Sequence, residues 1–586
     1  MLKALSEKDL YEKIVELAVR RGFFWQSYEI YGGVAGFVDL GPLGSILKKN
    51  IENKWRQWFI LKHQDFIVEI ESPAIMPKAV LEASGHLEHF TDPIVECLRC
   101  GRKFRADHLI EDAIGKSVEG LTPQQLTEII KENNIKCPSC GGQLSEVRTF
   151  SLLFRTTIGP YSENVGFIRP EAAQGMFVAF KRVYDSMRGR MPLGIGQIGK
   201  VGRNEISPRQ GVIRLREFTI MEVEFFFDSE KPKCPFISEV ENDEIRLITA
   251  ENKLKGIKEP ITVTIKEALE KGYIVNEWLA YFMALAQKFV RELGIPFNKQ
   301  VFEDKLPHER AHYSSQTFDQ LVKVSRWGWI EVAGHSYRGD YDLSRHMGFS
   351  GKDLTVYKQF SEPQEVLVEE ISLNHEVLER SYPEEYRKIV NAFSKRDKNI
   401  MLAELKAKGY IELAGKRLGP EFFKIAKVKK VVKGKRFIPH VVEPSFGAER
   451  LLYATLEYAY TVKNGRVILR LPRDIAPISL AVFPLVSKEP LVSIAKEIYE
   501  NFKKEGLRVI YDESGNIGRR YARADEIGVP LAITVDYQTV EDNTITIRNR
   551  DTWEQVRAPI KEAYVKIPEY LRYRLEFKDL GVPLKK

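Results

Sequence analysis

Cysteine is scarce in this chain, and long apolar runs are missing. Five cysteines among 586 residues exclude a disulfide-held scaffold and fit a reducing compartment, so we expect a cytoplasmic location. No apolar run is long enough to span a bilayer, and no membrane partner is expected. The first 21 residues carry four acidic side chains on an amphipathic helical pattern, which argues against a secretory or organelle-targeting segment.

A large excess of one charge sign is also missing. The 89 basic and 81 acidic residues leave a net charge of +8, which permits a nucleic-acid partner but does not require one. With 44% hydrophobic and 29% charged residues, the composition is typical of a globular protein rather than a disordered one. The length predicts roughly two to four domains.

Changes of pattern along the chain predict four segments. Residues 1–90 combine helices with a glycine-rich loop, and residues 91–150 form an insertion that holds two CxxC pairs. Residues 151–475 return to strands, and within them residues 235–425 are predicted to alternate helices with charged connectors. Residues 476–586 alternate strands and helices, which predicts a small α/β domain.

The two CxxC pairs have the spacing of a metal site. Cys97 and Cys100 form one pair, Cys137 and Cys140 form the other, and a glycine follows each pair. Four thiolates in two tight turns suit tetrahedral zinc, so a structural zinc site is predicted. Four unrelated thiols, or a site that has lost its metal, remain alternatives. The fifth cysteine, Cys234, has no partner in the pattern.

The segment from Gly202 to Phe227 is predicted to form two strands joined by a polar loop. Alternate residues of a strand share a face, so cations, an aromatic ring and carboxylates should follow one another on one side. That order suits a ligand with phosphates, a flat base and a nearby ammonium group. A charged strand face is often simply solvated, and this alternative stays open from the segment alone. The predicted face carries Arg214, Arg216, Phe218, Ile220, Glu222 and Glu224, joined across the hairpin by Arg203 and Glu205.

A second strand-to-helix element lies near residue 445. Glu443 and Ser445 share a strand face, and Gly447 is predicted to open a helix with Arg450 in its first turn. The free N–H groups of a helix N-terminus attract anions, and an arginine there strengthens a phosphate site. An arginine in a first helical turn is by itself more often a surface residue.

Two further carboxylates stand in unusual settings. Glu171 lies between a strand-like stretch and a helix in RPEAAQG, and Glu331 lies in a strand between Ile330 and Val332. Burying a carboxylate is costly unless it is paired or binds a metal. From its own segment, Glu331 is expected to point outward.

With these residues assembled, the chain resembles class II aminoacyl-tRNA synthetases, and closely the homodimeric glycyl-tRNA synthetases, over nearly its whole length. The stretch from GPLGSILKKNIENKWRQWF through SPAIMP resembles class II motif 1, RNEISPRQGVIRLREF resembles motif 2, and EPSFGAERLLY resembles motif 3. Glycyl-specific stretches also match, namely SGHLEHFTDP, FRADHL, RPEAAQG, REFTIMEVEFF and RGDYDLSRH.

The resemblance implies an α+β fold, in which helices flank an antiparallel sheet. A zinc-type insertion and a C-terminal α/β anticodon-binding domain would complete it. The implied activity joins glycine to tRNA(Gly) through glycyl-adenylate, with ATP as substrate and Mg²⁺ as cofactor. The implied assembly is a homodimer. The carboxylate of glycine is itself the nucleophile, so catalysis would come from positioning and charge stabilisation.

The resemblance also assigns roles at the ATP end. Arg203 would hold the α-phosphate, and Arg214 and Arg450 would hold the outer phosphates. Phe218 would stack on adenine, and Glu205 would help to position the base. Further residues implied for the ATP site are Arg216, Glu331, Val332 and Gly447.

At the glycine end, the resemblance places Glu171, Glu222 and Ser445 around the ammonium group. Arg105 and Arg338 would lie beside the substrate. The carboxylates implied for magnesium are Glu331 and Glu443, and the implied substrate-binding set also includes Phe218 and Glu443.

Three positions depart from the family pattern without removing a charged group that these roles need. Ala172 replaces a threonine, Gly202 replaces an aromatic residue, and Tyr337 replaces Asp or Asn. A non-catalytic paralogue, a synthetase for another amino acid such as threonine or proline, and a zinc protein that binds nucleic acid remain alternatives.

For tRNA, three arginines of IGRRYARADEIG fall on neighbouring positions of a predicted helix. They are available for anticodon bases or phosphates, although a solvated helix face is an equal alternative. These residues are Arg519, Arg520 and Arg523.

Overall fold

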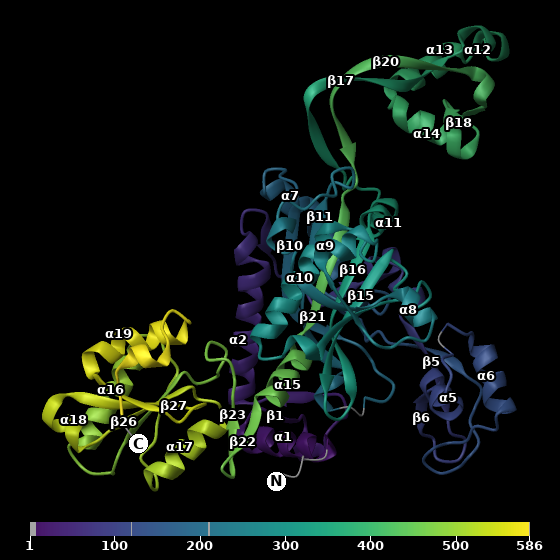
Figure 1. Ribbon diagram of the computed structural model, residues 1–586. Coiled ribbons are helices and arrows are strands. Elements are labelled where there is room, and N and C mark those ends of the chain that lie inside the picture. Colours follow the sequence, from purple (N-terminus) through teal and green to yellow (C-terminus); the bar gives the residue numbers. More distant parts are fainter. Residues whose placement is uncertain (1–6, 119, 209–210, 585–586) are drawn as a thin grey trace. The chain divides into compact units, whose positions relative to one another are not determined.

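The computed structural model describes residues 7–118, 120–208 and 211–584, which form two compact units (Figure 1). The larger unit holds the chain up to Leu354 and again from Pro439, and the smaller unit holds residues 355–438. No helix in these described ranges is both long and apolar enough to cross a membrane.

A nine-stranded sheet is the centre of the larger unit. Its central strands pair antiparallel, while β3 pairs parallel with β10 and β12 pairs parallel with β14. In spatial order the strands are β13 (Ile261–Thr264), β12 (Glu244–Ile248), β14 (Gln300–Asp304), β15 (Gln316–Val324), β16 (Gly328–Gly339), β21 (His440–Gly447), β11 (Glu217–Phe227), β10 (Leu193–Gly202) and β3 (Ile67–Glu69).

One face of this sheet carries the main core. Met221, Val223 and Phe225 alternate along β11 and pack with apolar side chains of three helices, as the period of two requires. The other face presents Phe218 and Glu222 to a cavity. The three helices are α2 (Pro42–Phe59), α10 (Glu277–Glu292) and α15 (Ala448–Ala459).

Helix α2 shows how closely this layer is packed. Trp55 and Phe59 are fully buried, and their rings stack with centroids 5.7 Å apart. Gly44 lies so close to the preceding chain that a Cβ atom would stand 1.8 Å from the carbonyl oxygen of Phe23. A residue with any side chain at this position would therefore push the helix away from the chain segment at Phe23.

Several shorter elements surround the sheet. The helices are α1 (Glu7–Arg21), α3 (Lys78–Ala83), α4 (His86–His89), α7 (Ala173–Ser186), α8 (Ala250–Leu254), α9 (Ile265–Glu270) and α11 (Tyr341–Ser350). The strands are β1 (Phe24–Gln26), β2 (Val38–Leu40), β4 (Ile75–Pro77), β8 (Arg155–Thr157), β9 (Val165–Ile168), β22 (Tyr460–Lys463) and β23 (Arg466–Leu469).

The cysteine-containing insertion folds as a small three-stranded sheet with two helices. Its own apolar cluster includes Val95, Phe104, Ile110 and Leu126, so the module has a core separate from the main one. The elements are β5 (Thr91–Glu96), β6 (Lys103–Arg105), β7 (Arg148–Ser151), α5 (Ala106–Ile114) and α6 (Pro123–Glu132).

The C-terminal part is a six-stranded mixed sheet with helices on both faces (Figure 1). Leu480 and Val482 face one apolar cluster, and Ala481 and Phe483 face the other, which explains why this strand reads as continuously apolar. The predicted strands and helices of this segment are confirmed. In spatial order the strands are β25 (Val509–Tyr511), β24 (Leu480–Pro484), β26 (Leu531–Val535), β27 (Thr544–Asn549), β28 (Gln555–Pro559) and β29 (Val582–Pro583), and the helices are α16 (Leu491–Lys504), α17 (Ile517–Glu526), α18 (Tyr537–Asp542) and α19 (Ile560–Leu571).

The smaller unit is a long antiparallel ribbon that carries a helical head (Figure 1). The ribbon is made of β17 (Val356–Leu373) and β20 (Phe423–Phe437), and β20 contains the strongly basic stretch near residues 424–435. The head contains α12 (His375–Ser381), α13 (Tyr386–Lys395), α14 (Lys398–Lys408), β18 (Ile411–Leu413) and β19 (Lys416–Leu418).

The prediction for residues 235–425 was wrong in one respect. Besides its helices and the predicted strand around Glu331 (β16), the region contains four more strands of the main sheet, β12 to β15. Charged side chains alternate with apolar ones along β15, from Phe318 and Asp319 to Val322 and Lys323. This alternation is typical of a strand with one buried face, and it was mistaken for a charged connector.

Candidate active site

A cavity of about 240 Å³ opens over strands β11, β15, β16 and β21. It brings together most of the side chains that the sequence predicted, although they come from distant segments. Those that line it are Glu171, Arg203, Glu205, Arg214, Phe218, Glu222, Glu331, Val332, Glu443, Ser445, Gly447 and Arg450.

Two arginines of motif 2, Arg203 and Arg214, reach this cavity from a loop. Strand β10 ends at Gly202 and β11 begins at Glu217, since the ladder between them pairs these two residues last. The sequence prediction that extended both strands further was therefore wrong. The side chains it had placed on strands are Arg203, Glu205, Arg214 and Arg216.

Ion pairs and backbone contacts shape this loop. Arg214 Nε donates to Glu205 Oε2 over 2.7 Å, so both side chains point into the cavity together. Arg216 donates instead to the carbonyl oxygens of Glu205 and Ala35, each over 2.8 Å. Arg216 thus fixes the loop from outside and does not line the cavity.

Arg203 stands beside an aromatic surface. Its guanidinium lies 5.3 Å from the ring centroid of Phe218 and 5.5 Å from that of Phe90, and its Nε donates to the carbonyl oxygen of Pro170 over 3.1 Å. Cation–π contacts of this kind hold a guanidinium in place while leaving its remaining N–H groups for a ligand.

Two of the departures from the family pattern have structural explanations. A Cβ atom on Gly202 would lie 2.8 Å from Ile168 and 3.1 Å from Phe154, so these side chains fill the space of the missing aromatic ring. Ala172 contributes its backbone N–H, which donates to Glu222 Oε2 over 3.0 Å and needs no side chain.

At one end of the cavity Arg450 binds Glu331. Arg450 Nη1 donates to the carbonyl oxygen of Glu331 over 2.7 Å and to its Oε2 over 3.2 Å. Although the surroundings desolvate this carboxylate, the guanidinium groups of Arg450 and Arg203 hold the pKa of Glu331 below its ordinary value. Glu331 therefore faces the cavity as an anion. Its side chain is 48% exposed, so it points outward as its own segment predicted, and that outward side lines the cavity.

Sequence reasoning missed Asp319, which lines the same end of the cavity. Lys305 Nζ lies 3.0 Å from its Oδ2. Burial and the neighbouring carboxylate of Glu331 raise the pKa of Asp319 to about 7. The alternation along β15 was the available signal, because it puts Asp319 and Thr317 on one face.

The other end of the cavity is acidic. Glu222, Glu443 and Glu171 are at most 6% exposed. Ser445 Oγ donates to Glu222 Oε1 over 2.6 Å. Behind them lies Glu224, whose two buried carboxylate oxygens have no hydrogen-bond partner among the described residues.

The pKa values of these carboxylates are shifted in different directions. Burial would raise the pKa of Glu171, but His86 and Arg338 hold it well below the ordinary value. Burial, together with repulsion from Glu222 and Glu171, raises the pKa of Glu443 against the attraction of Arg338. Burial and Glu171 also raise the pKa of Glu222. The pocket therefore favours a cationic ligand group.

Arg338 lies behind this pocket and is fully buried. It donates to Asp342 Oδ2 over 2.8 Å and to Glu443 Oε2 over 2.9 Å, and it approaches Glu171 Oε1 to 3.5 Å. Tyr313 lines the cavity, and its ring centroid lies 3.6 Å from the guanidinium carbon. Arg338 thus acts on the pocket through the carboxylates that it holds.

Arg105 lines a neighbouring pocket rather than the main cavity. Its guanidinium lies 3.2 Å from Asp92 and 2.8 Å from Asp107. Glu205 and Arg214 line both pockets, so Arg105 borders the motif 2 loop from the side of the cysteine module.

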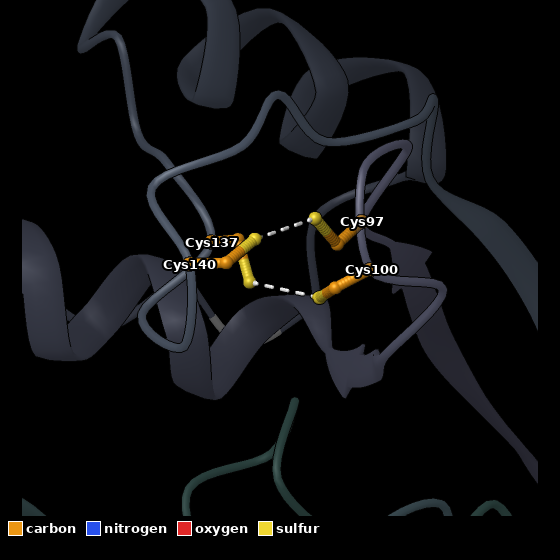
Figure 2. A group of neighbouring side chains, drawn as sticks. All are labelled: Cys97, Cys100, Cys137 and Cys140. Atoms are coloured by element: carbon orange, nitrogen blue, oxygen red, sulfur yellow. Dashed lines mark hydrogen bonds between the residues drawn. The ribbon is translucent and has the colours of Figure 1, made fainter.

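The four predicted cysteines converge at the tip of that module (Figure 2). Cys97 Sγ lies 3.5 Å from Cys140 Sγ, and Cys100 Sγ lies 3.8 Å from Cys137 Sγ. Four sulfur atoms bound to tetrahedral zinc at about 2.3 Å would stand about 3.8 Å apart, so the donor set fits zinc.

The two knuckles repeat the same backbone pattern. The N–H of Gly101 donates to the carbonyl of Cys97, and the N–H of Gly141 donates to the carbonyl of Cys137, both over 2.9 Å. Both glycines have a φ of 68°, a conformation that side chains disfavour. This explains why a glycine follows each pair.

Comparison with known proteins agrees with this geometry. The chain is 53% identical to a glycine–tRNA ligase of Aeropyrum pernix over 99% of its length and 100% of the relative's. Its identity to the glycine–tRNA ligase of Methanocaldococcus jannaschii is 46%, over 97% of this chain and 100% of that one. The chain belongs to the glycine–tRNA ligase family.

Solved structures agree with this fold. A prolyl-tRNA synthetase of Cryptosporidium parvum, crystallised with L-proline and AMP, superposes with a TM-score of 0.51 at 16% identity. The match covers 97% of this chain and 77% of that one. At this identity the likeness shows the class II fold alone.

The C-terminal sheet matches the anticodon binding domain family over residues 479–570. Within it the prediction for Arg520 was wrong, because its side chain is 1% exposed and donates to the carbonyl oxygens of Glu513 and Gly515. Arg523 pairs with Asp512. Of the three predicted arginines, Arg519 makes no such ion pair among the described residues.

Proposed function

We propose that the protein attaches glycine to tRNA(Gly) in two steps, through glycyl-adenylate. One observation supports this most strongly: a single cavity joins an end lined by guanidinium groups to an acidic pocket. A nucleotide triphosphate fits the first end, and the ammonium group of an amino acid fits the second. The comparison with curated relatives gives the same activity.

At the first end, adenine would stack on Phe218 and the α-phosphate would meet Arg203. Arg214 and Arg450 would hold the outer phosphates. These groups are preorganised, so they would stabilise the charge that develops on the phosphates in the transition state without reorganisation. Val332 and Gly447 complete the lining of this end.

Glu331 is the better placed of the two glutamates implied for Mg²⁺. It faces the cavity beside Asp319, and carboxylate oxygens are the ligands that Mg²⁺ prefers. Magnesium bound there would neutralise phosphate charge. Glu443 is paired with Arg338 at the acidic end, which supports a role toward glycine instead.

At the acidic end, the ammonium of glycine would lie among Glu171, Glu222 and Ser445. Glycine offers no side chain to bind, so its charged ends must supply the affinity. A pocket filled up to the α-carbon rejects larger amino acids by steric clash, and no smaller amino acid competes, so no editing step is needed.

Further features are proposed from the resemblance. The four cysteines hold a structural zinc ion, the chain works in the cytoplasm, and it forms a homodimer. Ile30 and Tyr31, beside motif 1, are 88% and 84% exposed, which supports a partner surface in that region. Arg105 and Arg216 are proposed to support the substrates through the motif 2 loop.

Aminoacylation with labelled glycine and glycine-dependent ATP–pyrophosphate exchange test the proposal together. We expect Arg203→Ala to slow exchange by about 100- to 1000-fold, because one transition-state donor is lost. We expect Glu222→Gln to raise the KM for glycine by about 10-fold or more, because a carboxylate facing the ammonium is lost.

The matched control is Lys200→Ala. Lys200 lies on β10, the strand that leads to Arg203, and its exposed side chain pairs with Glu217 of β11. It should behave as the wild type. Unchanged glycine affinity in Glu222→Gln would contradict the ammonium site. Wild-type protein without exchange at any magnesium concentration would contradict the activity and favour a non-catalytic paralogue.

A further inference from the structure

We infer that His86 is a positioning residue that fixes Glu171 for the ammonium group of glycine. The inference rests on the proposed function. It gives a role to the SGHLEHF stretch, which belongs to none of the three class II motifs. His86 does not line the main cavity, so it would act through the carboxylate that it touches.

His86 is 2% exposed and opens the short helix α4. Its Nε2 lies 3.4 Å from Glu171 Oε1. The other ring nitrogen, Nδ1, lies 2.8 Å from Ser84 Oγ. The imidazole therefore bridges a turn of the chain to the acidic pocket.

The hydrogen-bond network indicates where the proton of His86 resides. A carboxylate oxygen only accepts, so the contact with Glu171 is favourable only when Nε2 carries a proton. Ser84 Oγ lies 2.8 Å from Nδ1 and 3.3 Å from the carbonyl oxygen of Leu81, so two acceptors share its one proton. When the hydroxyl donates to Nδ1, the neutral imidazole carries its proton on Nε2 and presents N–H to Glu171.

A second histidine fixes the turn that holds Ser84. His312 Nε2 lies 2.8 Å from the carbonyl oxygen of Ser84, which can only accept, so this nitrogen is a donor. Gly85 has a φ of 84°, and a Cβ there would lie 3.1 Å from the same nitrogen. A side chain at this position would therefore crowd His312.

All three donors around Glu171 approach the same oxygen. Gln174 Nε2 donates to Oε1 over 3.0 Å, and His86 Nε2 and Arg338 Nη2 lie 3.4 and 3.5 Å from it. Gln174 is itself held, because its amide donates to Asp342 and accepts from His346. With Oε1 occupied, Oε2 is the oxygen left for a ligand in the cavity that Glu171 lines.

Removing His86 would take away one of these donors and let the carboxylate rotate. A hydrogen bond to a charged group contributes enough to change binding by about 10- to 100-fold. The loss should appear mainly in the KM for glycine, because among the described residues His86 contacts Glu171 directly and reaches Arg203 only through the ring of Phe90.

The experiment measures glycine-dependent ATP–pyrophosphate exchange for wild type, His86→Ala and His86→Gln, together with thermal midpoints. We expect His86→Ala to raise the KM for glycine by about 10- to 100-fold while the KM for ATP stays within about twofold. In His86→Gln the side-chain amide replaces the N–H donor, so much of the affinity should return.

The matched control is Glu88→Ala, because Glu88 lies on the same helix with its side chain 81% exposed. An unchanged glycine KM in His86→Ala would overturn the inference, as would equal rises for both substrates. If His86→Ala does not fold, His86→Gln decides the question. A glycine KM equal to that of wild type in His86→Gln supports the inference, whereas equal rises in the KM for glycine and the KM for ATP overturn it. Failure of wild type to catalyse exchange would instead overturn the proposed function.

Discussion

Arg338 and Glu443 form a buried ion pair, in which Nη1 donates to Oε2 over 2.9 Å. The Arg338 side chain is 0% exposed and that of Glu443 is 6% exposed. Arg338 also meets Asp342 and Glu171, so one guanidinium serves three carboxylates from separate segments. Its own pKa is raised well above the ordinary value, because their attraction outweighs the cost of burial.

This pair predicts a large effect of Arg338→Met on stability. Removing one partner leaves carboxylates buried without compensation, which typically costs about 3 to 5 kcal/mol. We expect a clearly lower thermal midpoint for Arg338→Met. Adding Glu443→Gln in the same chain should recover part of it, because one uncompensated charge then disappears. A midpoint equal to that of wild type in Arg338→Met would contradict this account.

The four cysteines predict one zinc ion per chain. We expect metal analysis of the purified protein to find it, and Cys100→Ser to lose it, because a structural site needs all four thiolates. Limited proteolysis of Cys100→Ser should then cut within residues 91–150. Cys234→Ser is the matched control, since Cys234 lies outside the cluster, and it should retain the metal. Zinc-free wild-type protein with an intact module would refute the prediction.

Buried histidines predict a loss of stability in mild acid. His335 lies on β16, between the ring of Phe302 on β14 and that of Phe446 on β21. Burial lowers the pKa of His335 to about 3. Below the unfolded pKa of about 6.5, the unfolded chain binds a proton that the folded chain does not. The stability is therefore complete above about pH 6.5 and falls as the pH drops, by about 2 kcal/mol at pH 5.

The measurement compares thermal midpoints at pH 7.5 and pH 5. His335→Gln cannot titrate, and its amide N–H can still donate to Gln320, which lies 3.2 Å from His335 Nε2. We expect a smaller acid-induced drop in this variant than in wild type. His89→Gln changes an exposed histidine and should keep the wild-type drop. Equal drops in all three proteins would show that His335 contributes nothing to the pH dependence.

The sequence predicted elements best where the local pattern is complete. Strand β24 was predicted because its residues form a short continuous apolar run, and helix α16 because its apolar residues follow the helical period of 3.6. Alternation also predicted that Phe218 and Glu222 share one face of β11, and that Glu443 and Ser445 share one face of β21, and all four line the cavity.

Other features depend on contacts that no local pattern records. The place where the β10–β11 ladder ends decides that Arg203 and Arg216 belong to a loop, and the packing around Gly202 helps to set that place. The position of Arg520 in its helix did not indicate that the side chain is buried and donates to backbone carbonyl oxygens. The pairing of Arg338 with carboxylates from other segments appears only after those segments are folded together.

Strands β16 and β21 are neighbours in the central sheet, yet residues 355–438 separate them along the chain. Their register pairs Ala333 with Phe446 and Ser336 with Glu443, and it shifts only between Tyr337 and Gly339, which do not line the main cavity. The entropic cost of closing such a loop grows only with the logarithm of its length, about 0.6 kcal/mol for each doubling. The length and sequence of residues 355–438 can therefore change at small entropic cost, while the strands that carry the site stay paired.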